Sequence, residues 1–173
     1  MRRSSLVVLL VCSLLVNSAP VGAALCWEPP VMALVADPFR EPACPWCPGN
    51  RGIAYATPVG MAVRAVAAGR VTFAGVVAGT RYLVVELANG WRLTYGNLAD
   101  PRAGAELPAG APVVAGMVVG HTAGDLHFGL RDDAGVYRDP APNLGTWHHR
   151  ARLIPLDEPP PPAPPPVLRC SRA

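Results

Sequence analysis

The chain contains 173 residues, of which 51% are hydrophobic and 16% are charged, and its formal net charge at pH 7 is +3. This length suits one domain with short tails, and so small a positive net charge gives no basis for nucleic-acid binding. Every basic residue is arginine, and Ala, Gly, Pro and Val are abundant, which is typical of a GC-rich genome.

Residues 1–24 are typical of a secretory signal peptide. Two arginines precede an apolar run over residues 6–15, and small residues follow as far as Ala24. The run is shorter than the ~20 residues that span a bilayer, so we expect no stable membrane span after cleavage near Ala24. Leu25-Cys26 resembles the start of a lipoprotein, but leucine is bulkier than the small residue that normally precedes a lipidated cysteine. We therefore do not expect Cys26 to be lipidated. The rest of the chain is therefore predicted to be secreted into the extracytoplasmic cell envelope of a bacterium.

Four cysteines remain after cleavage, and an even number in an exported chain favours disulfides. Of the three connectivities, we favour Cys44–Cys47 with Cys26–Cys170, the second of which ties the two tails together. The C-P-W-C spacing also occurs in thioredoxin-type redox sites. Those sites need a helix after the motif, whereas prolines surround this pair and no helical pattern follows it, so a structural disulfide is favoured.

The next segments predict an N-terminal leader over residues 25–36 and a β domain over 37–147. The leader lacks periodicity, whereas short alternating runs separated by glycine turns follow it. Asn89-Gly90 is a strong signal for a two-residue hairpin. The fold class is therefore all-β, mostly antiparallel, with few or no helices. The expected strands cover residues 70–77, 82–87, 91–95, two short pieces within 113–119, and 125–131.

The side-chain pattern of these strands also predicts which face is buried. In the first, Val71, Phe73 and Val77 are expected on one face. In the last, Leu126, Phe128 and Leu130 form one face, and Asp125, His127 and Gly129 form the other.

Residues 148–173 form a predicted Arg/Pro-rich C-terminal tail. The sequence DEPPPPAPPPVL has too little apolar surface to join a core, so we expect a stiff spacer. The alternative is a segment that a proline-binding partner recognises. His148 and His149 are adjacent and are expected on the surface.

Segments in this order resemble the lysostaphin-type (LytM-like) zinc peptidases, which cut peptide bridges in bacterial peptidoglycan. Each motif alone is weak, but together they span about residues 37–145, and the resemblance implies the LytM-like β fold. The matching segments are DPF (37–39), PGNRGIAY (48–55), the stretch that begins with TPVG (57–71), WRLTYGNL (91–98), GMVVG (116–120), DLHF (125–128) and DP (139–140).

The resemblance implies zinc ligands at positions 50, 54 and 127 and proton-moving histidines at 97 and 125. This chain has Asn50, Ala54, Asn97 and Asp125 there, and only His127 remains. Catalytic zinc needs about three imidazole or carboxylate ligands and an open position for water. We therefore predict no bound metal, no catalytic residue and no cofactor, with Asn97, Asp125 and His127 as remnants of a pseudoenzyme site.

An alternative is an active zinc endopeptidase with substitute ligands. Asp125 and His127 share one strand face, and His121 lies just upstream, so these three residues would supply the ligand types that zinc accepts.

The expected role of the inactive domain is to bind peptidoglycan or to regulate a cell-wall hydrolase, as degenerate LytM-like factors do. Arg51 is a candidate partner for a stem-peptide carboxylate. The residues expected to line the groove are Asn50, Arg51, Tyr95, Asn97, Asp125 and His127.

Overall fold

The computed structural model describes residues 26–44, 46–101, 107–148, 162 and 165–170. The predicted signal peptide and most of the proline-rich segment therefore lie outside the described residues. Across those described stretches, no helix is long and apolar enough to cross a membrane.

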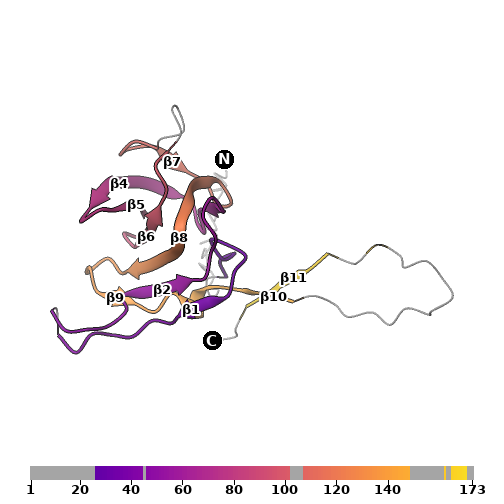
Figure 1. Ribbon diagram of the computed structural model, residues 1–173, viewed down its shortest axis with the longest axis horizontal. Coiled ribbons are helices and arrows are strands. Elements are labelled where there is room, and N and C mark those ends of the chain that lie inside the picture. Colours follow the sequence, from indigo (N-terminus) through magenta and orange to yellow (C-terminus); the bar gives the residue numbers. More distant parts are fainter. Residues whose placement is uncertain (1–25, 45, 102–106, 149–161, 163–164, 171–173) are drawn as a thin grey trace, which may run out of the picture.

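The prediction of an all-β, antiparallel fold is confirmed (Figure 1). Apart from one 3-10 turn, Ala141–Asn143, the regular elements in the described part of the chain are strands. They are β1 Val35–Asp37, β2 Gly52–Tyr55, β3 Ala62–Arg64, β4 Gly69–Val77, β5 Thr80–Glu86, β6 Arg92–Leu98, β7 Pro112–Val113, β8 Val118–Arg131, β9 Tyr137–Arg138, β10 Thr146–His148 and β11 Val167–Arg169.

The main sheet has the strand order β1-β2-β8-β6-β5-β4-β7, and β3 and β9 also pair with β8. The long β8 organises this sheet because its first half pairs with β3 and its second half lies between β2 and β6. A hairpin at Asn89-Gly90 joins β5 to β6 as predicted, but its loop is longer than two residues, because the backbone N–H of Leu87 donates to the carbonyl oxygen of Trp91. Gly90 adopts a φ of 81°. Glycine occupies that left-handed conformation at little steric cost.

The core lies on one face of this curved sheet. Leu126, Phe128 and Leu130 are fully buried, which confirms the predicted alternation of the last strand. The chain around β3 covers them, and there the backbone N–H of Val66 donates to the hydroxyl of Tyr95 from across the core. The side chains on the other face of β8, including His127, do not take part in this core.

The predicted face of the 70–77 strand is wrong in part. Val71 is buried as expected, but Phe73 and Val77 are exposed. A bulge shifts the register between Val71 and Phe73, and a one-residue shift moves every later side chain to the opposite face. Phe73 and Val77 therefore lie on the same side of the sheet as His127.

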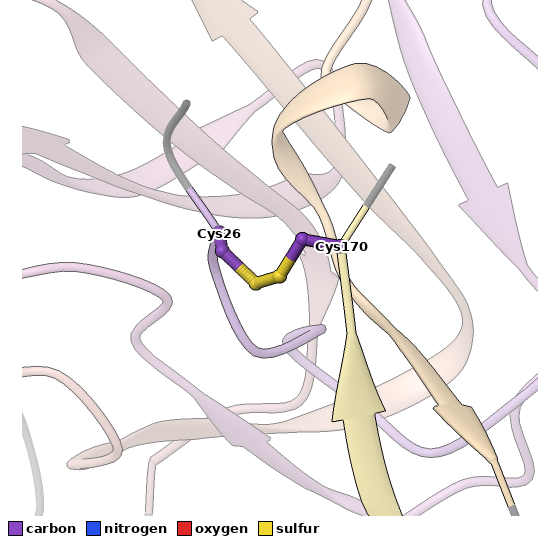
Figure 2. The surroundings of a disulfide bond; sticks show 2 residues. All are labelled: Cys26 and Cys170. Carbon is purple, nitrogen blue, oxygen red and sulfur yellow. A yellow bond between two sulfur atoms is a disulfide. The ribbon is translucent and has the colours of Figure 1, made fainter. Parts of the chain in front are cut away.

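The predicted disulfides, Cys26–Cys170 and Cys44–Cys47, are both confirmed. Figure 2 shows the first, in which the chain just before buried Trp27 meets the end of β11, with Cα atoms 5.6 Å apart. The described part of the predicted leader thus contributes Trp27 and Val31 to the core. Strands β10 and β11 form a separate two-stranded ribbon that extends from the main sheet (Figure 1).

Candidate functional site

A groove of about 600 Å³ crosses the sheet face opposite the core, and we call it the His127 groove. Its floor is formed by the outward side chains of β4, β5, β6 and β8. The turn before β2 and Tyr137 of β9 form one wall of the groove. The lining residues are Gly49, Asn50, Arg51, Phe73, Val77, Tyr82, Val84, Arg92, Thr94, His127, Gly129, Arg131 and Tyr137.

His127 is held where neighbouring strands carry glycine. A Cβ at Gly52 would lie 2.7 Å from Cε1 of the imidazole, and a Cβ at Gly96 would lie 3.4 Å from Cβ of His127. Glycine at position 52 leaves room for the imidazole ring, and glycine at position 96 leaves room for the ring of Tyr82 beside His127. Burial lowers the pKa of His127 below its ordinary value, because water solvates the charged imidazolium less well there. The imidazole is therefore neutral at pH 7.

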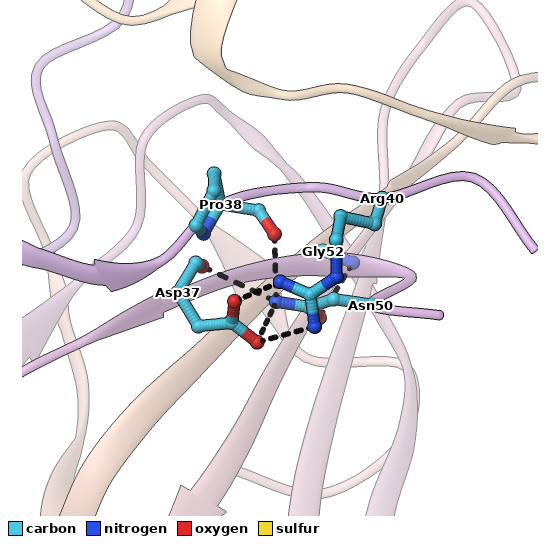
Figure 3. A network of polar contacts seen from close by, with 5 residues as sticks. All are labelled: Asp37, Pro38, Arg40, Asn50 and Gly52. Atoms are coloured by element: carbon cyan, nitrogen blue, oxygen red, sulfur yellow. Dashed lines mark hydrogen bonds and ion pairs between the residues drawn. The ribbon is translucent and has the colours of Figure 1, made fainter. Parts of the chain in front are cut away.

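Asn50 lies at the edge of the groove, and its amide is fully engaged elsewhere (Figure 3). Its Nδ2 donates to the backbone oxygens of Asp37 and Pro38 and to Oδ2 of Asp37, over 3.1–3.2 Å. Its Oδ1 accepts from the N–H of Gly52 at 3.3 Å. Arg40 pairs with the same Asp37 carboxylate and, by hydrogen bonding, lowers its pKa. Asn50 thus clamps the loop that holds the Cys44–Cys47 disulfide.

The three positions implied as zinc ligands do not fit a zinc ion. Ala54 lies directly opposite His127 on paired strands but carries no donor atom. The side chain of Asn50 hydrogen-bonds to the β1 segment and to Gly52 rather than presenting a free donor. Within the described ranges, no three His, Cys, Asp or Glu side chains are grouped so that they could hold a metal ion. His127 is left as one neutral ligand, too few for a catalytic zinc site.

The substitute set of His121, Asp125 and His127 is not brought together. His121 lines a second cavity of about 370 Å³, which Tyr82 separates from the His127 groove. His121 pairs with Ala62 of β3, whereas His127 pairs with Ala54 of β2, and no three His, Cys, Asp or Glu side chains in the described ranges are grouped so that they could hold an ion. The carboxylate of Asp125 accepts instead from the backbone N–H of Thr57 at 3.3 Å.

Asn97 and Asp125 contact each other at one end of β6, outside the lining of the groove. Asn97 has a φ of 61°, a left-handed conformation that asparagine tolerates better than most residues. Its Nδ2 donates to the backbone oxygen of Asp125 at 2.8 Å. These residues support the backbone where the pairing of β6 with β8 changes register.

Tyr95 was predicted to line the groove, and this is wrong. Its side chain is fully buried and packs on Phe128, with ring centroids 5.3 Å apart. Tyr95 pairs with Phe128 across β6 and β8, so both rings point to the core face. Burial raises the pKa of the phenol. The alternation of Leu93 with Tyr95 was the available signal for this orientation.

Tyr95→Phe is expected to lower the free energy of unfolding by about 1–3 kcal/mol, because the N–H of Val66 would lose its buried acceptor. Urea denaturation followed by tryptophan fluorescence measures this loss. Ligand binding in the His127 groove should be unchanged, since the hydroxyl points into the core. A variant of normal stability with impaired binding would contradict this placement of Tyr95.

Sequence reasoning missed most of the groove. Arg131 continues the alternation of Asp125, His127 and Gly129 by one step, so the strand pattern could have predicted that it faces the groove. Tyr137 follows a turn, and nothing in the sequence shows that β9 folds back on β8. Phe73 and Val77 were hidden by the bulge in β4.

Comparison with known proteins gives one family and a set of similar folds. The sequence pattern of peptidase family M23 matches residues 48–140. No curated protein sequence matches the chain. Among solved structures, Csd3 of Helicobacter pylori is 27% identical with a TM-score of 0.60; the match covers 71% of this chain and 36% of Csd3, so the chain spans about a third of that protein.

Two matched structures are catalytic domains of a size closer to this one. The catalytic domain of the prophage-encoded M23 protein EnpA from Enterococcus faecalis is 21% identical with a TM-score of 0.53, covering 68% of this chain and 96% of that domain. The catalytic domain of lysostaphin from Staphylococcus simulans is 19% identical with a TM-score of 0.53, covering 64% of this chain and 90% of that domain. At these identities the likeness establishes the fold.

Proposed function

This chain belongs to peptidase family M23, and from that premise we propose that it is a secreted, catalytically inactive member. It acts in the cell envelope as a peptidoglycan-binding or hydrolase-regulating module. One observation carries the proposal: of the three positions at which the resemblance implies zinc ligands, only His127 has a side chain that zinc binds well.

The shape of the groove supports a binding role, because the groove is formed although two of the three implied zinc ligands are absent. Its floor combines the neutral imidazole of His127 with arginine, tyrosine and aliphatic side chains. Such a mixture of apolar surface and a few hydrogen-bonding groups is typical of ligand sites. The Asn50 clamp also replaces a potential metal ligand with a structural contact, which favours a surface that holds a peptide without hydrolysing it.

The alternative, a zinc endopeptidase that cleaves peptidoglycan peptide bridges with substitute ligands, is disfavoured by the positions of His121, Asp125 and His127. The first lies in a different cavity, and the second hydrogen-bonds to Thr57. No step through a metal follows from this arrangement.

Sedimentation with purified insoluble peptidoglycan tests the proposal. The wild-type domain is expected to pellet, to release no soluble peptide, and to bind equally with and without a chelator. His127→Ala should weaken retention several-fold, because the imidazole forms part of the floor. His121→Ala is the matched control, since that histidine is exposed outside the groove, and it should bind normally.

Two outcomes would contradict the proposal. Chelator-sensitive release of peptides would identify an active metallopeptidase. Absence of retention, together with no effect of the domain on the rate of a cell-wall hydrolase from the same envelope, would exclude both proposed roles.

A further inference from the structure

The His127 groove carries an excess of positive charge. Arg51, Arg92 and Arg131 line it, and none of the lining residues, all of which belong to the described part of the chain, is Asp or Glu. The charged groups beside it are Glu86 on β5 and the Asp37–Arg40 pair next to Asn50. Burial lowers the pKa of His127, so its imidazole adds no positive charge at pH 7.

A row of cross-strand partners explains where this charge is concentrated. Glu86 lies opposite Arg92, Arg92 lies opposite Arg131, and Arg131 lies opposite Tyr137, across β5, β6, β8 and β9. Glu86 forms an ion pair with Arg92 at 2.9 Å. Arg131 therefore faces a like charge, an arrangement that destabilises antiparallel strands. Among the residues that the structure describes, Arg131 has no acidic partner.

Tyr137 holds the Arg131 side chain in place. The guanidinium donates to the tyrosine hydroxyl, and its Cζ lies 4.3 Å from the ring centroid. Cζ of Arg51 lies 5.7 Å from the same centroid. Nε of Arg131 is buried and has no hydrogen-bond partner among the described residues. A cation fixed by a ring and a hydroxyl is preorganised for an anion, because little side-chain freedom is lost on binding.

The side of the groove formed by β4 and β5 is apolar. Phe73 pairs with Val84, Val84 with Thr94, and Thr94 with Gly129, so these residues form a second row across the floor. Strands lie about 4.8 Å apart, which places Phe73 on β4 roughly 14 Å from the β8 end of the row. A ligand that spans the floor is therefore a few residues long, charged at one end and aliphatic at the other.

We propose that Arg131, positioned by Tyr137 and flanked by Arg51 and Arg92, binds a carboxylate of a short peptide whose aliphatic part lies toward Phe73 and Val84. This inference rests on the proposed function, because it takes a peptide as the ligand of the His127 groove. It adds the chemical class of the ligand, an acidic peptide, and the residue that recognises the acid. Guanidinium and carboxylate form paired, charge-assisted hydrogen bonds that a neutral amide cannot match.

Calorimetric titration with matched ligands tests the inference. The probes are soluble stem peptides released from purified peptidoglycan and the same peptides after their carboxylates are converted to amides. We expect the acid to bind the wild-type protein at least about tenfold more tightly, because a hydrogen bond to a charged group contributes about 1.5–3 kcal/mol. Arg131→Gln should reduce the affinity for the acid to that for the amide and leave the affinity for the amide unchanged.

Three further variants distinguish a loss of carboxylate recognition from damage to the fold. Arg131→Lys retains the charge without the paired donors and should give an intermediate affinity. Tyr137→Phe removes the hydroxyl that holds Arg131 and should weaken binding of the acid a few-fold. Arg64→Gln removes the same charge from β3, where Arg64 contacts the backbone oxygen of Gly116, and should bind like the wild type.

The outcomes separate this inference from the proposed function. Equal affinity for acid and amide, or equal weakening of both by Arg131→Gln, would overturn recognition of the carboxylate while peptide binding stands. Competition by inorganic phosphate at the same concentration as the acid would also overturn it, because the site would then select charge alone. Failure of both peptides to bind the wild type, with no retention on peptidoglycan, would overturn the proposed function itself.

Discussion

The double variant Asn50→His, Ala54→Asp is expected to bind one zinc ion per chain in the His127 groove. Position 54 lies opposite His127 on paired strands, where Cβ atoms are about 5 Å apart, close enough for two side chains to share an ion. Position 50 lines the same groove. Three ligands of imidazole and carboxylate type would then be present. Full protein-bound zinc sites contribute on the order of 10 kcal/mol, so a change from no tight binding to submicromolar affinity is expected.

The substitution at position 50 also has a cost, because the histidine cannot reproduce the contacts of the asparagine amide with Asp37, Pro38 and Gly52. Without zinc, the double variant is expected to lose about 1–3 kcal/mol of stability. Added zinc should restore it, since a ligand that binds only the folded state raises the free energy of unfolding.

Elemental analysis after dialysis and thermal denaturation with and without zinc measure both effects. Either single substitution should bind zinc much more weakly than the pair, and adding His127→Ala to the double variant should abolish binding. Tight zinc binding by the wild-type chain would contradict the loss of the site. Its absence in the double variant would show that residues 50, 54 and 127 do not converge.

Removal of the Cys26–Cys170 disulfide is expected to lower the free energy of unfolding by about 5 kcal/mol. The bond closes a loop with a sequence separation of 144, and the chain-entropy relation gives about this value for such a loop. Removal of Cys44–Cys47, whose separation is 3, should cost about 2 kcal/mol by the same relation. A loss of 5 kcal/mol approaches the total stability of many domains.

Urea unfolding of Cys26→Ser, Cys170→Ser and of Cys44→Ser, Cys47→Ser measures the difference. The two double variants are matched because each removes one bond and replaces two sulfurs with oxygens. Equal losses would contradict the entropic argument. They would indicate instead that the longer bond only fastens the β10–β11 ribbon, without constraining the unfolded chain as a whole.

The sequence predicted the fold well because local signals agreed with it. Alternation in β8, the Asn89-Gly90 hairpin and the order of family motifs all pointed to one antiparallel sheet. The side of the sheet on which a residue lies was harder to predict, because period-two alternation fails at irregularities. The bulge in β4 moved Phe73 and Val77 to the groove, and no feature of the local sequence marks it.

The composition of the candidate site could be predicted from the sequence only in part. Asn50, Arg51 and His127 lie in the lining of the groove, whereas Asn97 and Asp125 support the backbone nearby and Tyr95 is in the core. The charged row became visible only through the register, because Arg92, Arg131 and Tyr137 are distant in sequence and meet through strand pairing. A motif from an enzyme family directs attention to the positions of the family's catalytic residues. It carries no information about the side chains outside the motif that line the groove.

The covalent link between residues 26 and 170 has a mechanical consequence. Their Cα atoms lie 5.6 Å apart, so the chain enters and leaves the domain at nearly the same point (Figure 2). A pulling force applied to the polypeptide outside this pair is carried by the sulfur–sulfur bond and does not load the hydrogen bonds of the sheet. Tension applied at the two ends would therefore leave the folded shape of the domain unchanged.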